Sequence, residues 1–138
     1  LLEHVRMRIG LRLPPGLDPD DLSQRLSDWA GEGAVTVHGR ELPFRASNRN
    51  ALTSAFLAAI RAEGGRPAFV TKTGTSDMNV IGPRWRCPIV AYGPGDSAYD
   101  HTPEERIQIS EFLRAIRVLT GALHRLGSTL GATIEATP

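Results

Sequence analysis

The sequence of 138 residues predicts an α/β protein in which helices cover a sheet. Apolar and charged residues alternate in residues 4–13, which is the period of a half-buried strand. Residues 88–92 form an unbroken apolar run of the kind that is buried on both faces of a sheet. Apolar residues three and four positions apart in residues 109–126 indicate an amphipathic helix. Strand and helix patterns follow one another along the chain, which favours layers of helix and sheet.

The first 46 residues predict a β-α-β arrangement. A Pro-Pro-Gly sequence at residues 14–16 ends the first strand. Asp18 followed by Pro19 is typical of a helix N-cap with proline at the first helical position, and the helix is expected to run towards Gly31. Two further strands, the second of them weak, are expected at residues 34–38 and 42–45.

The rest of the chain predicts two helices on either side of two strands. Ser47 or Asn48 is expected to cap the first helix, which two glycines end at residues 64–65. Strands are expected at residues 67–71 and 88–92, with an irregular loop at residues 72–83 between them.

The last helix has a clear start signal. Thr102, Pro103 and Glu105 fit a capping box with proline at the first helical position. Gly127 is expected to end this helix. A break near Ser47 is the one plausible domain boundary.

The composition limits the classes of partner. A net charge of +1 provides no broad field for nucleic acid or an anionic membrane. Apolar stretches are interrupted well before 18 residues, so no membrane span is expected, and a cytoplasmic location is the default. The chain begins inside an alternating segment and without Met, from which we expect a cut end.

Two glycine-bearing loops, residues 73–79 and 93–101, each follow an apolar strand, where ligands of open α/β sheets bind. The first loop offers hydroxyls and backbone amides to a carbonyl or carboxylate, although a capped turn around Asp77 explains the same residues. His101 is a candidate zinc ligand, but one histidine makes no site, and a capping role is the alternative. Cys87 is expected to be a buried structural thiol.

Three segments in these regions resemble, in order and spacing, the C-terminal motifs of the M20 metallopeptidase-like deacetylases. They are Gly-Thr-Ser-Asp-Met-Asn at residues 74–79, Ala-Tyr-Gly-Pro-Gly at residues 91–95 and His-Thr-Pro-Glu-Glu at residues 101–105. The first is most similar to the branch that hydrolyses acetyl-lysine, acetyl-ornithine or lysine attached to an amino-group carrier protein. The Gly-Leu-Arg-Leu-Pro-Pro-Gly segment at residues 10–16 also resembles the lid strand of this family.

The resemblance implies a hydrolase that releases lysine or ornithine from an N-acyl or carrier-linked precursor in amino-acid biosynthesis. Residues 1–46 would be the second half of an α+β lid domain that forms a homodimer, and residues 47–138 the C-terminal part of the catalytic domain. Two zinc ions, or cobalt, would act in the complete enzyme. His101 matches a metal ligand.

Gly74, Thr75 and Ser76 match the loop that lines the substrate site. The other ligands and the general base belong to motifs absent from this sequence, so we expect this chain alone to hold no metal and to be inactive. The alternatives are a non-catalytic α/β binding or dimerisation module and, less well supported because phosphate motifs are missing, a nucleotide-binding protein.

Overall fold

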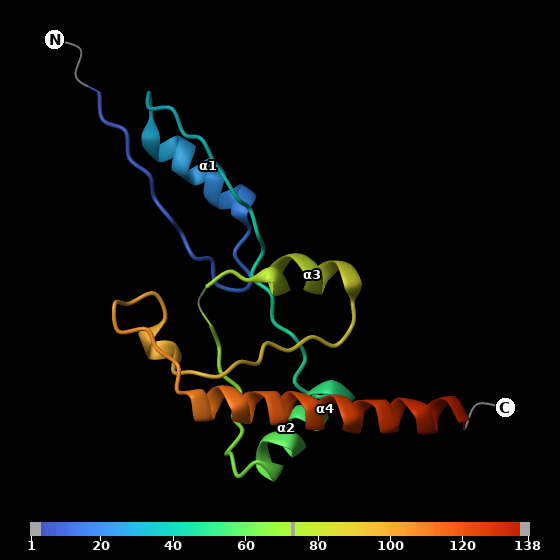
Figure 1. Ribbon diagram of the computed structural model, residues 1–138. Helices are drawn as coiled ribbons and strands as arrows, with labels where there is room; N and C mark the ends of the chain where they lie inside the picture. Colours follow the sequence, from blue (N-terminus) through green and yellow to red (C-terminus); the bar gives the residue numbers. More distant parts are fainter. Residues whose placement is uncertain (1–3, 73, 136–138) are drawn as a thin grey trace. The chain divides into compact units, whose positions relative to one another are not determined.

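The computed structural model describes residues 4–72 and 74–135 (Figure 1), and within these ranges its regular structure is helical. The elements are α1 (Pro19–Ala30), α2 (Ala51–Ala62), α3 (Asp77–Trp85), the 3₁₀-helix η1 (Ser97–Tyr99) and α4 (Ile109–Glu135). The chain divides into two compact units. One comprises Leu1–Arg45 and Thr71–Arg86, and the other comprises Ala46–Val70 and Cys87–Pro138.

The first helix forms where the sequence predicts it. The Asp18 carboxylate accepts a hydrogen bond from the Asp20 N–H at 2.8 Å, and Pro19 occupies the first helical position. Gly31 ends α1 with a φ of 56°, a conformation that glycine adopts readily. Arg40 forms an ion pair with Asp20 and so ties the segment after α1 back to the helix start.

The expected strands are not formed within residues 4–72 and 74–135. The segments in question are residues 4–13, 34–38, 42–45, 67–71 and 88–92. A strand has no hydrogen bonds of its own and becomes stable only beside a partner, so the alternating pattern alone does not produce a sheet. The helical part of the α/β prediction is confirmed, whereas its sheet is not seen in this part of the chain.

The prediction of an irregular loop at residues 72–83 is wrong, because α3 lies there. Ser76 and Asn79 cap this helix reciprocally: the Ser76 hydroxyl accepts from the Met78 N–H at 3.3 Å, and the Asn79 side chain accepts from the Ser76 N–H at 3.0 Å. The Asn79 amide also donates to the Leu42 carbonyl at 2.8 Å. These contacts, together with the packing of Gly82 on Phe44, outweigh the poor helix propensity of the segment.

The core of the second unit is the packing of α2 against α4. Its buried residues are Ala55, Phe56, Ala59, Val118 and Ala122. An added Cβ on Gly121 would lie 3.6 Å from the Ala59 Cβ, so the two helices approach closely through small side chains.

The cap of α2 lies two residues beyond the predicted Asn48. The Asn50 side chain accepts from the Thr53 N–H at 2.9 Å, and the Thr53 hydroxyl accepts from the Asn50 N–H at 3.3 Å. The same hydroxyl lies 3.1 Å from the Asn48 carbonyl, to which it donates. The buried Thr53 therefore completes a capping box that Ser47 and Asn48 cannot form.

Both predicted ends of the last helix are wrong. Glu105 accepts a hydrogen bond from the His101 N–H at 2.9 Å, one residue further back than a capping box requires, so it closes a turn and α4 begins only at Ile109. At the other end α4 continues through Gly127 to Glu135. A glycine inside a helix costs about 1 kcal/mol relative to alanine, which a long helix tolerates.

The two helical glycines Gly82 and Gly127 give opposite predictions. A Cβ on Gly82 would overlap the Phe44 ring, whereas a Cβ on Gly127 would meet no atom within 4 Å. Gly82→Ala should therefore lower the free energy of unfolding by about 1–2 kcal/mol through overpacking. Gly127→Ala should raise it by about 0.5–1 kcal/mol through helix propensity alone.

Urea unfolding followed by circular dichroism measures both changes. A gain in stability for both variants would show that Phe44 moves aside without cost and would contradict the packing described for α3.

Candidate functional site

The loop of residues 74–76, which is predicted to line a substrate site, begins at a glycine with free space around it. An added Cβ on Gly74 would meet no atom within 4 Å, and the side chains of Thr75 and Ser76 are exposed. Ser76 is the N-cap of α3, so its hydroxyl already accepts a backbone hydrogen bond. The capped-turn alternative is thus realised, with Ser76 rather than Asp77 as the capping residue. Thr73 lies outside the described residues.

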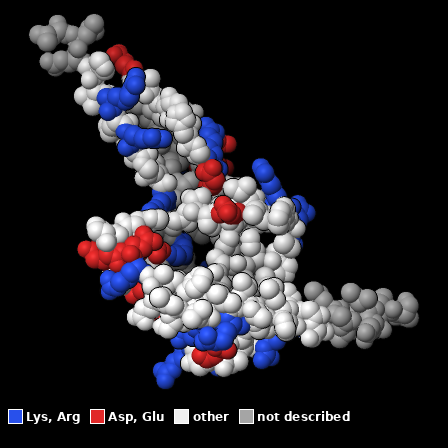
Figure 2. Space-filling model, viewed as in Figure 1, with Lys and Arg blue, Asp and Glu red and all other residues white. Residues whose placement is uncertain are grey.

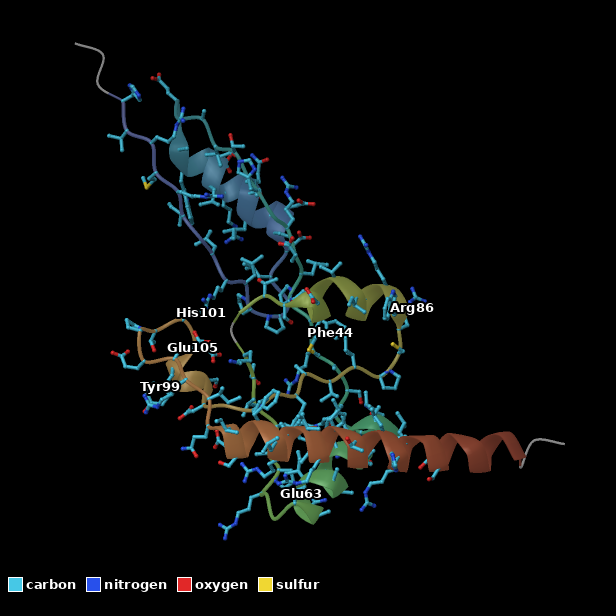
Figure 3. All side chains as sticks on the ribbon, in the orientation of Figure 1. Phe44, Glu63, Arg86, Tyr99, His101 and Glu105 are labelled. Atoms are coloured by element: carbon cyan, nitrogen blue, oxygen red, sulfur yellow. The ribbon has the colours of Figure 1, made fainter. Side chains whose placement is uncertain are left out.

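His101 lies in a turn that local contacts hold in place (Figure 3). Its backbone is left-handed, with a φ of 64°, and its N–H donates to Glu105. The Thr102 hydroxyl donates to the Tyr99 carbonyl at 2.8 Å. The guanidinium carbon of Arg106 lies 4.6 Å from the centre of the Tyr99 ring. The backbone beneath the exposed His101 imidazole is therefore fixed by at least three separate interactions.

The donor set for a metal ion is incomplete in the part of the chain that the structure describes. No group of three or more His, Cys, Asp or Glu side chains in these residues is arranged to hold a metal ion. Catalytic zinc sites use three protein ligands. His101 is exposed, and its assignment as a metal ligand stays a prediction.

The loop of residues 74–76 and the His101 turn belong to different compact units. The structure brings His101 together with Glu105, Tyr99 and Arg106 within one of them. The expectation of a buried Cys87 is wrong, because Cys87 is exposed. It follows Arg86, which ends α3 with a left-handed φ of 51°.

A pocket of about 220 Å³ lies beside the second glycine loop, where Gly93, Pro94 and Gly95 contribute to its wall. Its charged and polar residues are Arg66, Tyr92, Glu111 and Arg114, and none of them was a predicted site residue. Tyr92 belongs to the Ala-Tyr-Gly-Pro-Gly segment at residues 91–95, whereas Arg66, Glu111 and Arg114 come from separate segments and match no motif. The position of Arg66 directly after two glycines was the one further signal.

Tyr92 is the residue of this pocket whose pKa is perturbed. Partial burial raises the pKa of its phenol above the usual 10.0, and the positive charge of Arg114 opposes this shift. The Tyr92 ring lies against Phe56, with 5.3 Å between the ring centroids and a 49° angle between the planes. The contact attaches residues 88–92 to the α2–α4 core.

Charges of both signs are interspersed over the face that Figure 2 shows. In the described residues, none of the helices combines the length and the apolar content that crossing a bilayer would require.

Comparison with known proteins gives one family. The model of peptidase family M20/M25/M40 matches residues 3–125. A LysW-lysine hydrolase of Deinococcus radiodurans is 54% identical over 128 residues, which cover 91% of this chain and 35% of that protein. A putative LysW-lysine/LysW-ornithine hydrolase of Thermococcus kodakarensis is 43% identical over 120 residues, or 87% of this chain and 31% of that protein.

A protein of Pyrococcus furiosus with the same putative name is 39% identical over 122 residues, which cover 88% of this chain and 34% of that protein. The chain spans about a third of the length of these curated relatives.

The raised pKa of Tyr92 predicts a loss of stability at high pH. The folded state favours the neutral phenol, so this contribution is complete below the unfolded pKa of about 10 and is lost as the pH rises through the higher folded pKa. Tyr92→Phe should make the decline in the free energy of unfolding above pH 10 shallower. Arg114→Met should raise the pKa of Tyr92 further, because it removes the opposing charge.

Phenolate absorbance measures this pKa directly in a Tyr99→Phe background, where Tyr92 is the one remaining tyrosine. An unchanged pKa in Arg114→Met would rule out the electrostatic contact between the two side chains.

Proposed function

Since the chain belongs to peptidase family M20/M25/M40, we propose that it forms part of a metal-dependent amide hydrolase that releases lysine or ornithine from a carrier protein. The observation that carries this proposal is the 54% identity to a LysW-lysine hydrolase across 91% of the chain. Two further relatives have names that include LysW-ornithine. The substrate of the whole protein is accordingly a small basic amino acid joined to a carrier protein by an amide bond, in amino-acid biosynthesis in the cytoplasm.

The family is generally metal-dependent, usually with zinc, and we assign His101 as one protein ligand. A bound pair of zinc ions, or cobalt, would supply Lewis acidity towards the amide carbonyl and an activated water. The role of this chain is to hold one imidazole in place. The bond from the His101 N–H to Glu105, and the contact of Arg106 with Tyr99, fix the backbone that carries it.

Gly74, Thr75 and Ser76 are proposed to line the substrate site. The open space above Gly74 leaves its backbone accessible, and the Thr75 side chain is exposed. Because Ser76 caps α3 through its hydroxyl oxygen, it can still donate its hydroxyl proton to a substrate oxygen. The loop therefore presents donors to a carbonyl or carboxylate group.

Residues 1–46 are proposed to be the second half of a lid domain that forms a homodimer, and residues 47–138 the end of the catalytic domain. One division between the compact units, between Arg45 and Ala46, supports this boundary, although Thr71–Arg86 groups with the first 45 residues. The apolar side chains of residues 4–13 support the dimer, because Val5 and Met7 are 90% and 75% exposed. Pairing of this edge with a second copy would bury them.

The test is a chimera of the Deinococcus radiodurans hydrolase in which this chain replaces the matching segment. We expect it to bind zinc and to release lysine from LysW-lysine. His101→Asn should lower zinc content and reduce turnover by about a hundredfold or more, because each protein ligand is essential to a catalytic site. Asparagine tolerates the left-handed φ of 64°, so the free energy of unfolding should change by less than about 1 kcal/mol.

His124→Asn is the matched control, since His124 is an exposed histidine on α4. It should leave zinc content and turnover unchanged. Full zinc occupancy and turnover in His101→Asn would exclude His101 as a ligand. A folded chimera without any hydrolysis of LysW-lysine would favour the non-catalytic binding module instead.

A further inference from the structure

The pocket of about 220 Å³ beside the second glycine loop has more positive than negative charge in its wall. Two arginines line it, Arg66 and Arg114, against one acidic residue, Glu111. These residues belong to the compact unit that contains α2 and α4, so the pocket forms within a single unit. None of the residues proposed as a metal ligand or as part of the substrate wall lines it. The excess of positive charge makes the pocket attractive to anions.

The two guanidinium groups have no ion pair or hydrogen bond among the residues that the structure describes. Arg117, about one turn further along α4 than Arg114, provides the contrast, because its guanidinium pairs with Glu63 at 2.7 Å. Arg114 follows Glu111 by three positions, a spacing at which opposite charges on a helix can pair. Glu111 lies in the first turn of α4, where the helix dipole stabilises a carboxylate without a paired cation. The guanidinium donors of Arg66 and Arg114 are therefore available to a ligand.

Tyr92 adds a third donor to the same wall. Its phenol is neutral at neutral pH and can donate its O–H. The charge of Arg114 acts on the pKa of this phenol, which indicates that the two groups lie near each other. An added Cβ on Gly93 or Gly95 would meet no atom within 4 Å, so the glycine loop leaves room for a ligand beside its backbone.

The chemistry of these donors selects the class of ligand. Guanidinium groups match the oxygens of carboxylate and phosphate groups with paired hydrogen bonds, and a phenol donates one more. The volume of about 220 Å³ lies below the range of about 300–1,000 Å³ that is usual for drug-sized ligands, which favours a smaller molecule. We propose that Arg66, Arg114 and Tyr92 form a binding site for the carboxylate or phosphate group of a small anionic molecule. This proposal does not rest on amide hydrolysis.

The experiment is isothermal titration calorimetry of this chain at low ionic strength, with succinate and inorganic phosphate as the two ligands. We expect saturable binding of at least one of them with a Kd of about 1 mM or tighter. Arg66→Gln and Arg114→Gln should each weaken binding by about tenfold or more, because charge-assisted hydrogen bonds to the anion are lost. Glu111→Gln should strengthen binding by about threefold, because it removes a negative charge from the wall. Tighter binding of succinate would assign the site to carboxylates, and tighter binding of phosphate would assign it to phosphates.

Arg125→Gln is the matched control, since Arg125 is an exposed arginine of α4 that does not line the pocket. It removes the same charge and should leave the affinity unchanged. Circular dichroism of each variant checks that the helices remain. Arg66 follows the end of α2 and is exposed, so Arg66→Gln keeps the test valid if Arg114→Gln disturbs α4.

Absorbance of the Tyr92 phenolate gives a second readout in the Tyr99→Phe background. A bound anion that accepts the Tyr92 O–H favours the neutral phenol, so a saturating ligand should raise the pKa of Tyr92. The proposal would be overturned by the absence of saturable binding of both anions, or by an unchanged pKa of Tyr92 at saturation. Equal affinities of Arg114→Gln and Arg125→Gln would also overturn it, because binding would then follow the total charge and not the pocket.

Discussion

The close packing of α2 on α4 through small side chains is the constraint on which the second compact unit depends. Ala59, Val118 and Ala122 bring the helices together, and the buried Phe56 of α2 meets Tyr92. That ring contact fixes the end of residues 88–92. The glycine loop that follows, and then the His101 turn, start from this fixed point. Residues that are far apart in the sequence are thus positioned by one helix pair.

The turn that carries His101 is held by hydrogen bonds between residues close together in the sequence. The Asp96 carboxylate caps η1 by accepting from the Ala98 N–H at 2.9 Å, and Glu105 accepts from the His101 N–H. These hydrogen bonds lie within ten residues and require no contact with the core. Such a turn holds the backbone of His101, so little backbone entropy is lost when the imidazole binds a ligand. The proposed metal ligand is therefore preorganised by its own neighbours.

Sequence patterns predicted the secondary structure correctly where it is determined by residues close together in the sequence. Asp18 and Pro19 were sufficient to place the start of α1, and the apolar stripes identified α2 and α4. The prediction of a loop at residues 72–83 failed where distant residues decide, since α3 depends on contacts with Leu42 and Phe44. The predicted start of the last helix failed for a local reason, because Glu105 accepts from the His101 N–H instead of capping a helix. Motif resemblance predicted site roles for His101 and residues 74–76, which stay predictions, whereas the pocket around Tyr92 joins segments that share no motif.

The same distinction explains why the described residues form helices but not the predicted sheet. A helix satisfies its backbone within one segment, whereas a strand depends on another segment beside it. Residues 88–92 contact the core through the side chains of Val90 and Tyr92. Their place beside α2 and α4 therefore depends on side-chain packing.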